Sequence, residues 1–168
     1  MTVFVDWQIK KLCEQGMINP FIPEHINPSS IDVCIGISAM VDTVNGFENH
    51  AQFDLYTKEK PYPLQPNECM LVSTMETLKL PSHIAAELKL KSSRAREGLS
   101  HALAGWIDNG FHGILTLELK NYSTKHCVNI YPGLRVGQLK IINTALPEKT
   151  YLNGRYAGKT TVLGSLDG

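Results

Sequence analysis

The stretch ILTLELK at residues 114–120 decides the fold class. Leu115, Leu117 and Leu119 alternate with polar side chains, and this period of two is typical of a half-buried β-strand. The pattern predicts that the leucines face the core and that Glu118 lies on the opposite face. Taken alone, Glu118 would be a solvated strand residue opposite a lysine, because glutamate is rarely buried without a partner.

Similar short runs recur along the chain, separated by turn residues. They lie at residues 31–37, 51–56, 69–75, 85–91, 128–131 and 134–142. This rhythm is typical of an all-β barrel or sandwich. One short amphipathic helix is expected near the N-terminus, capped by Asp6 and ending at Gly16, with Ile9, Leu12 and Cys13 on one face.

Length and charge limit the class of protein. The 168 residues fit one domain spanning 1–168, with no repeat or linker, and sixteen Lys and Arg balance sixteen Asp and Glu. This balance excludes the basic footprint of a protein that coats nucleic acid, but a small anionic ligand is still compatible with it. The start lacks an export signal and the apolar runs are short, so we expect a soluble, cytoplasmic protein with no membrane partner.

The four cysteines and the C-terminal stretch carry two further predictions. Cys13, Cys34, Cys69 and Cys127 are widely separated, which favours reduced thiols acting as small hydrophobes over disulfides or a structural zinc site. The last stretch, approximately residues 148–168, is rich in Gly, Thr and Lys. It is either a flexible lid or a frayed terminus without a role.

The stretch KLKSSRAREGLSH at residues 89–101 joins a strand to a short helical turn before Gly98. Ser92 or Ser93 can cap this turn, and the N–H groups at its start, with the basic side chains nearby, can bind an anion. The alternative is a capped surface turn with solvated arginines.

A second carboxylate precedes the leucine-rich strand in AGWIDNG at residues 104–110. Asn109-Gly110 is a strong hairpin dipeptide, so Asp108 taken alone indicates an exposed hairpin turn.

Five segments stand at consistent spacing and resemble one family. They are INPSSIDVCIG at 26–36, KSSRAREGL at 91–99, AGWIDNGFHGILTLELKN at 104–121, PGLRVGQLKI at 132–141 and RYAGKTT at 155–161. Together they resemble the dCTP deaminase branch of the dUTPase-like trimeric nucleotide hydrolases. The resemblance implies a distorted jelly-roll β-barrel with a short N-terminal helix, a homotrimer, and active sites between subunits. The H-x-E and P-C-x-x-C segments of zinc deaminases are absent from the sequence, so we expect a reaction without zinc.

The resemblance favours hydrolytic deamination of dCTP to dUTP and ammonia, a step in pyrimidine deoxynucleotide biosynthesis. The alternative is a bifunctional dCTP deaminase and dUTP diphosphatase that yields dUMP and diphosphate. Gly105 favours this alternative, because a small residue there would leave room for water near the α-phosphate. A plain dUTPase or a non-catalytic nucleotide-binding trimer is the third option, although Glu118 and the tail sequence both depart from ordinary dUTPases.

Four residues match catalytic positions of the family. Glu118 matches the general base and proton shuttle of deaminases, for which a partly dry pocket must raise its pKa. Ser92 would hold the attacking water, and Arg96 would restrain Glu118. Asp108 matches the aspartate that orients water towards the α-phosphate in dUTPases.

Nucleotide binding is carried over in the same way. The expected binding residues are Lys91, Ser93, Ala104, Asp108, Phe111, Gln138, Arg155, Tyr156 and Lys159. Phe111 would pack on deoxyribose, and the backbone around Ala104 would read the base. The basic side chains would hold the triphosphate together with Mg²⁺, which the phosphates and water would coordinate.

The chain departs from the family pattern at four positions. Lys91 replaces the arginine of some members, Cys34 replaces an arginine in the N-terminal motif, Leu103 stands where threonine is usual, and Lys159 stands where the tail normally has glutamine. Lys91 keeps the charge of arginine but loses its bidentate geometry. Leu103 and Lys159 lie in segments expected to line or close the pocket, so they could mark a modified base or altered regulation.

Overall fold

The computed structural model describes residues 1–166, and β-strands are its main secondary structure. The strands are β1 (Thr2–Val3), β2 (Ile18–Asn19), β3 (Ile26–Asn27), β4 (Ser30–Thr43), β5 (Gly46–Asn49), β6 (Tyr62–Leu64), β7 (Cys69–Lys79), β8 (Ile84–Leu90), β9 (Leu99–His101), β10 (Trp106–Ile107), β11 (His112–Asn121), β12 (Val128–Ile130) and β13 (Arg135–Asn143). The helices are α1 (Asp6–Glu14) and α2 (Ser92–Arg96), with 3₁₀ turns η1 (Pro23–His25), η2 (Phe53–Leu55) and η3 (Tyr151–Asn153). The predicted all-β class is confirmed.

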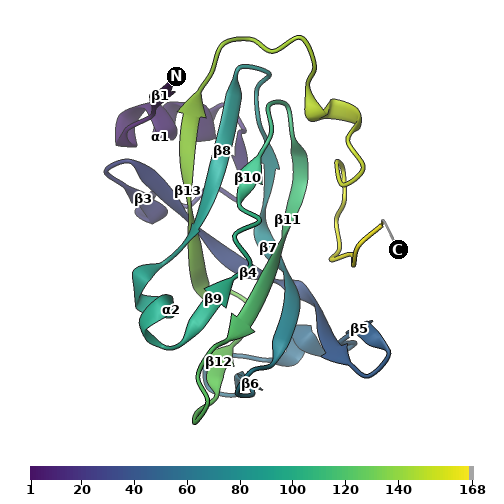
Figure 1. Ribbon diagram of the computed structural model, residues 1–168. Coiled ribbons are helices and arrows are strands. Elements are labelled where there is room, and N and C mark those ends of the chain that lie inside the picture. The colour runs from purple at the N-terminus through teal and green to yellow at the C-terminus, as the bar shows by residue number, and fades with distance from the viewer. Residues whose placement is uncertain (167–168) are drawn as a thin grey trace.

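The main sheet has the strand order β10-β8-β13-β4-β7-β11-β9 and curls around one core, while β12 and β6 form a separate pair (Figure 1). Strand β4 serves both halves of the sheet, because its partner changes from β13 to β7 and its register shifts between Ile35 and Ala39. Val33, Ile35 and Leu139 from one half, with Val72 and Leu117 from the other, are among the buried core residues. The curl therefore lets one sheet bury both of its halves against each other.

The N-terminal helix forms as expected on its apolar face but begins differently. Ile9 and Cys13 are buried, and the helix ends before Gly16. Val5, not Asp6, is the N-cap; its N–H donates to the Gln8 side chain at 3.1 Å. The Asp6 cap was a wrong prediction, because Gln8 satisfies the start of the helix from within its first turn.

The predicted strand at residues 51–56 is also wrong. The chain forms the 3₁₀ turn η2 there, with Phe53 fully buried. The rings of His50, Tyr56 and Tyr62 meet one another edge to face at 5.4 Å, and Phe53 packs against the first two. A compact aromatic cluster buries more apolar area than an extended strand would at this position, so tertiary packing overrides the local β propensity. Within residues 1–166, no helix has the length and apolar character required to span a membrane.

Candidate active site

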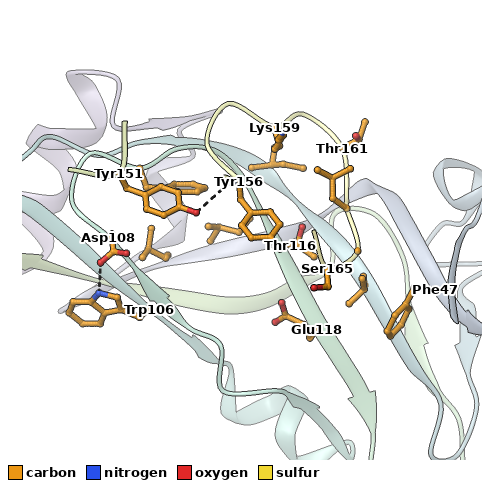
Figure 2. Close-up of a pocket in the computed structure, with 17 residues that line it drawn as sticks. Phe47, Trp106, Asp108, Thr116, Glu118, Tyr151, Tyr156, Lys159, Thr161 and Ser165 are labelled. Carbon is orange, nitrogen blue, oxygen red and sulfur yellow. Dashed lines mark hydrogen bonds between the residues drawn. The ribbon is translucent and has the colours of Figure 1, made fainter. Parts of the chain in front are cut away.

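Glu118 lies on the face of β11 opposite the buried leucines, as its position in the alternation predicts. Strand β11 pairs with β7, with Glu118 opposite Leu71, and Leu117 and Leu119 are each 2% exposed. The Glu118 side chain is half-buried and points into a cavity rather than into open solvent (Figure 2). Burial raises the pKa of its carboxyl above the ordinary value, and the backbone N–H of Glu118 offsets part of that rise. Glu118 is therefore not the solvated residue that its strand, taken alone, indicates.

The alternation fails at the start of β11. The register of β11 against β7 shifts between Ile114 and Thr116, and the Leu115 N–H donates to Thr74 Oγ1 at 3.0 Å. Leu115 is consequently half-buried and lines the same cavity as Glu118. A β-bulge moves side chains from one face towards the other, so strict alternation could not place this leucine.

Asp108 reaches the cavity from the turn that follows β10. Its carboxylate accepts a hydrogen bond from Trp106 Nε1 at 3.0 Å (Figure 2). The turn is not a hairpin, because β10 pairs with β8 whereas β11 pairs with β7. Asn109 anchors the turn instead: its side-chain amide donates to Ser82 O at 3.1 Å and to Thr144 Oγ1 at 2.6 Å. The Asn-Gly dipeptide thus carries the chain from one half of the sheet to the other.

The C-terminal segment packs along the start of β11 within the same chain (Figure 1). The Gly158 N–H donates to His112 O at 2.8 Å, and the Ile114 N–H donates to Lys159 O at 3.1 Å. Gly113, with φ +121°, allows this approach, since a Cβ there would lie 3.1 Å from Lys159 N and O. The segment therefore covers the cavity at least as far as Ser165; residues 167–168 of the expected lid lie outside the described part.

Aromatic rings form the wall of the cavity near Asp108. Phe111 is 7% exposed and packs on Tyr151 with ring centroids 5.9 Å apart. The Tyr156 N–H donates to the Tyr151 hydroxyl at 3.4 Å (Figure 2). Tyr151, Tyr156 and Lys159 all come from the C-terminal segment, so one wall belongs to β11 and the opposite wall to the tail.

Together these elements enclose a cavity of about 530 Å³ with both acids at its wall. Its lining residues are Phe47, Leu71, Trp106, Ile107, Asp108, Phe111, Ile114, Leu115, Thr116, Glu118, Tyr151, Tyr156, Lys159, Thr161, Leu163, Gly164 and Ser165. The volume is in the range of small-molecule sites, and the walls are largely apolar with a few polar groups, as in most ligand pockets. Such a cavity could hold a planar base or sugar against its rings while presenting a carboxylate with a raised pKa.

Gly105 has a packing role. A Cβ at this position would lie 2.5 Å from Leu88 O, and the Leu88 N–H donates to Gly105 O at 2.7 Å. Glycine is therefore required here because the chain crosses β8 at close range. The space that its missing side chain provides is occupied by the β8 backbone rather than by a water site.

The second predicted group surrounds α2 and does not line this cavity. Ser92, Ser93 and Arg96 are exposed, and the N-cap of α2 is Lys91, with no side-chain cap. The prediction that a serine caps this turn is wrong, because both serines fall inside the first helical turn instead of preceding it.

Lys91 is held by a buried carboxylate. Its Nζ donates to both oxygens of Asp32 at 2.6 Å, and Asp32 is 3% exposed. Gln138 lies opposite Asp32 in the register of β13 and β4, and it accepts a hydrogen bond from Ser30 Oγ at 3.1 Å. Lys91 and Gln138 are thus gathered around Asp32, apart from Glu118.

Arg96 lines a separate hollow of about 560 Å³, together with Lys58, Arg94 and His126. Ala104 is exposed in the connection before β10, and Arg155 is exposed on the tail; neither lines the cavity of Glu118. Of the twelve predicted site residues, five line this cavity in the single chain: Glu118, Asp108, Phe111, Tyr156 and Lys159.

Several lining residues were missed by the motif analysis. Trp106 carried a weak signal, since it lies two residues before Asp108 in the same motif. Tyr151 and Phe47 carried none, because they reach the cavity from distant loops and strands.

The family model described as dCTP deaminase-like matches residues 3–144. The chain belongs to the dCTP deaminase-like family. A relative from Acidothermus cellulolyticus is 41% identical over 145 residues, covering 77% of this chain and 73% of the relative, and one from Thermobifida fusca is 36% identical, covering 91% and 84%. Both relatives are named "dCTP deaminase, dUMP-forming".

The fold of the dCTP deaminase-like family is also seen in a solved structure. The crystal structure of 2'-deoxycytidine 5'-triphosphate deaminase from Agrobacterium tumefaciens superposes with a TM-score of 0.67 at 19% identity, over 83% of this chain. The chain spans about half, 47%, of the length of that structure. This likeness confirms the dUTPase-like β-fold that the motifs implied.

The relatives correct one prediction. We expected dUTP as the principal product and placed dUMP formation second. The relatives' names specify dUMP formation, and a further relative from Methanoregula boonei, 34% identical over 167 residues, carries the same name. The expectation of dUTP as the end product is therefore wrong. The sequence argument undervalued Asp108, which lines the same cavity as Glu118.

Proposed function

We propose that this protein is a bifunctional enzyme that deaminates dCTP and cleaves the resulting dUTP to dUMP and diphosphate. The observation that carries the proposal is the meeting of Glu118 and Asp108 at the wall of one 530 Å³ cavity. Each carboxylate suits one of the two hydrolytic steps. The dUMP-forming names of the relatives support this pairing.

In the first step, water adds to C4 of cytosine and ammonia leaves. Glu118 accepts a proton from the water and passes it to N3; it then takes the proton of the new C4 hydroxyl and passes it to the amine, which leaves as ammonia while the C4 carbonyl forms. A raised pKa suits this shuttle, since the same group must take up and give back a proton near neutral pH. Ser92 holds the attacking water, and Arg96 restrains the Glu118 carboxylate.

In the second step, water attacks the α-phosphorus of dUTP and diphosphate leaves. Asp108 orients that water, and the Trp106 indole fixes the carboxylate through its 3.0 Å hydrogen bond. Phe111 packs on the deoxyribose between the two reacting centres, and the backbone around Ala104 reads the base. Since both acids serve one bound nucleotide, dUTP need not leave between steps.

We further propose a homotrimer in which α2 of one subunit completes the cavity of its neighbour. Ser92, Ser93 and Arg96 are exposed and lie away from Glu118 in one chain, so a second copy is needed to bring them together. The phosphates would be bound beside α2 by Lys91 and Gln138. From the tail they would be bound by Arg155, Tyr156 and Lys159. Residues 148–168 would act as a lid within a single domain, in the cytoplasm.

Magnesium fits this arrangement as a companion of the nucleotide. Among residues 1–166, no three His, Cys, Asp or Glu side chains in the cavity lie close enough to share a metal ion. The phosphates and water would therefore supply most ligands, which is usual for Mg²⁺. When bound, the ion neutralises charge on the phosphate oxygens.

Product analysis tests the proposal directly. The protein is incubated with dCTP and Mg²⁺, and ammonia, diphosphate, dUTP and dUMP are measured over time. We expect ammonia and diphosphate in equal amounts with little free dUTP. Ammonia with accumulating dUTP would contradict the bifunctional assignment, and diphosphate from dUTP without ammonia from dCTP would identify a plain dUTPase.

A further inference from the structure

Two buried carboxylates lie near the start of β4, and their surroundings differ. Asp32, 3% exposed, is neutralised by Lys91 at 2.6 Å and by Arg135 at 3.6 Å. Glu76, 2% exposed, forms no ion pair with any lysine, arginine or histidine of residues 1–166. A buried carboxylate requires a proton or a positive partner. Among residues 1–166, Glu76 is therefore the one of these two carboxylates without an ion-pair partner.

The groups around Glu76 are metal ligands. The side chains of His25, Cys34 and Glu76 each offer one ligand atom, and these three atoms lie within 4.8 Å of one another. They come from three elements, η1, β4 and β7, so the sequence shows no spacing motif. Both Glu76 oxygens accept the Cys34 N–H, at 3.1 and 2.9 Å, which fixes the carboxylate while leaving lone pairs for another partner.

The donor set indicates which kind of ion would bind. One imidazole nitrogen, one thiolate and one carboxylate suit a borderline divalent ion such as Zn²⁺ better than Mg²⁺ or Ca²⁺, which prefer oxygen. Ligand atoms of a tetrahedral zinc site lie about 3.3–3.8 Å apart, so small side-chain rotations would close the cluster around an ion.

We propose that His25, Cys34 and Glu76 bind one Zn²⁺ ion, with water in the fourth position, at a site separate from the nucleotide cavity. None of the three residues lines that cavity. The ion would supply the positive charge that Glu76 lacks and would join η1 and β4 to β7. Its binding releases the Cys34 proton, since a coordinated thiol is held as thiolate. The site would stabilise the N-terminal part of the fold and takes no part in either hydrolytic step.

Cobalt absorption tests the thiolate ligand. The metal-free protein is titrated with Co²⁺, and the thiolate-to-cobalt charge-transfer band is recorded. We expect the band to saturate at one equivalent and to be bleached by Zn²⁺. Cys34→Ser should abolish it, and Cys127→Ser should leave it unchanged. Cys127 is the matched control because it is exposed beside His126, where adventitious binding would occur. A band that survives Cys34→Ser, disappears in Cys127→Ser or never forms in the wild type would overturn the proposal.

Thermal unfolding gives a readout that does not depend on the thiol. Saturating Zn²⁺ should raise the Tm of the metal-free wild type by several degrees, since a ligand that binds the folded state stabilises it. His25→Gln and Glu76→Gln should each weaken zinc binding by at least about 100-fold, because each removes a ligand. His25 is partly exposed, so its variant should fold even if substitutions at the two buried positions do not. An unchanged Tm in the wild type, or an equal rise in His25→Gln, would contradict a site made by these residues.

Discussion

The cavity beneath the tail and the surface around α2 differ in how much of a catalytic site each provides. The cavity is partly covered by the tail, has aromatic walls, and is lined by Asp108 and by Glu118, whose pKa is raised. The α2 surface presents Ser92 and Arg96 to solvent. Under the proposed function these two regions are complementary parts of one site, and they do not meet within one copy of the chain. Tests of function can therefore address each part, and then their joining.

The largest effect is expected from Glu118→Gln, which removes the proton shuttle but keeps the shape of the side chain. Ammonia release should fall by about 10²–10⁴-fold, the usual contribution of general acid–base catalysis. Nucleotide affinity, measured by calorimetry, should change little. Glu87→Gln is the matched control, because Glu87 also lies on a strand but pairs with Lys140 at 2.8 Å outside the cavity. Deamination retained in Glu118→Gln would remove the proposed mechanism.

Mixed oligomers test whether the two parts join between subunits. Glu118→Gln and Ser92→Ala chains are co-refolded in equal amounts. Random mixing should restore about a quarter of the wild-type sites, because each restored site takes one intact group from each kind of chain. Mixing Glu118→Gln with a chain that carries both substitutions should restore no activity, because neither chain then supplies an intact Glu118. If the first mixture stays as inactive as its parents, the site is not shared in this way.

Asp108→Asn should separate the two reactions. Diphosphate release should fall by about 100-fold, since misplacing the attacking water by about 1 Å costs that much. Ammonia release should persist, so dUTP should accumulate when dCTP is supplied. Equal loss of ammonia and diphosphate would show instead that Asp108 supports binding as a whole.

Gly105→Ala distinguishes a packing role from a catalytic one. The added Cβ would meet Leu88 O at 2.5 Å, so we expect a loss of about 1–3 kcal/mol of folding free energy, measured by denaturant unfolding. Gly164→Ala is the control, because a Cβ there meets nothing within 4 Å. Unchanged stability with altered diphosphate release would favour the earlier idea that Gly105 makes room for water.

The smallest effect concerns stability against pH. The folded-state pKa of Glu118 is raised by burial, so the protonated form is favoured by folding, and this contribution is lost as pH rises through the raised pKa. Glu118→Gln lacks the ionised form and should have a Tm a few degrees above wild type at pH 7. The difference should shrink as the pH falls below the ordinary glutamate pKa. A Tm difference independent of pH would show that Glu118 is not held in a drier environment.

Local patterns predicted most of the strands, but not the turn at residues 51–56 or which strands the Asn109-Gly110 turn connects. Alternation placed Glu118 opposite Leu117 and Leu119, and the β rhythm predicted the all-β class. The strand expected at 51–56 became a 3₁₀ turn because Phe53 joins an aromatic cluster formed by distant residues. The Asn109-Gly110 turn joins two halves of the sheet, and turn propensity cannot specify which strands it connects.

The sequence by itself determined the chemistry available to this protein: a strand glutamate, a turn aspartate, an exposed Ser-Arg turn and the spacing that matches the dCTP deaminase-like family. Only the tertiary structure decided which of these groups meet. Burial raises the pKa of Glu118, and the cavity that it lines is partly formed by residues more than thirty positions further along the chain. The His25, Cys34 and Glu76 cluster likewise exists only after three elements pack together. Dehydration and proximity are properties of the folded assembly, because they depend on contacts between residues that are far apart in sequence.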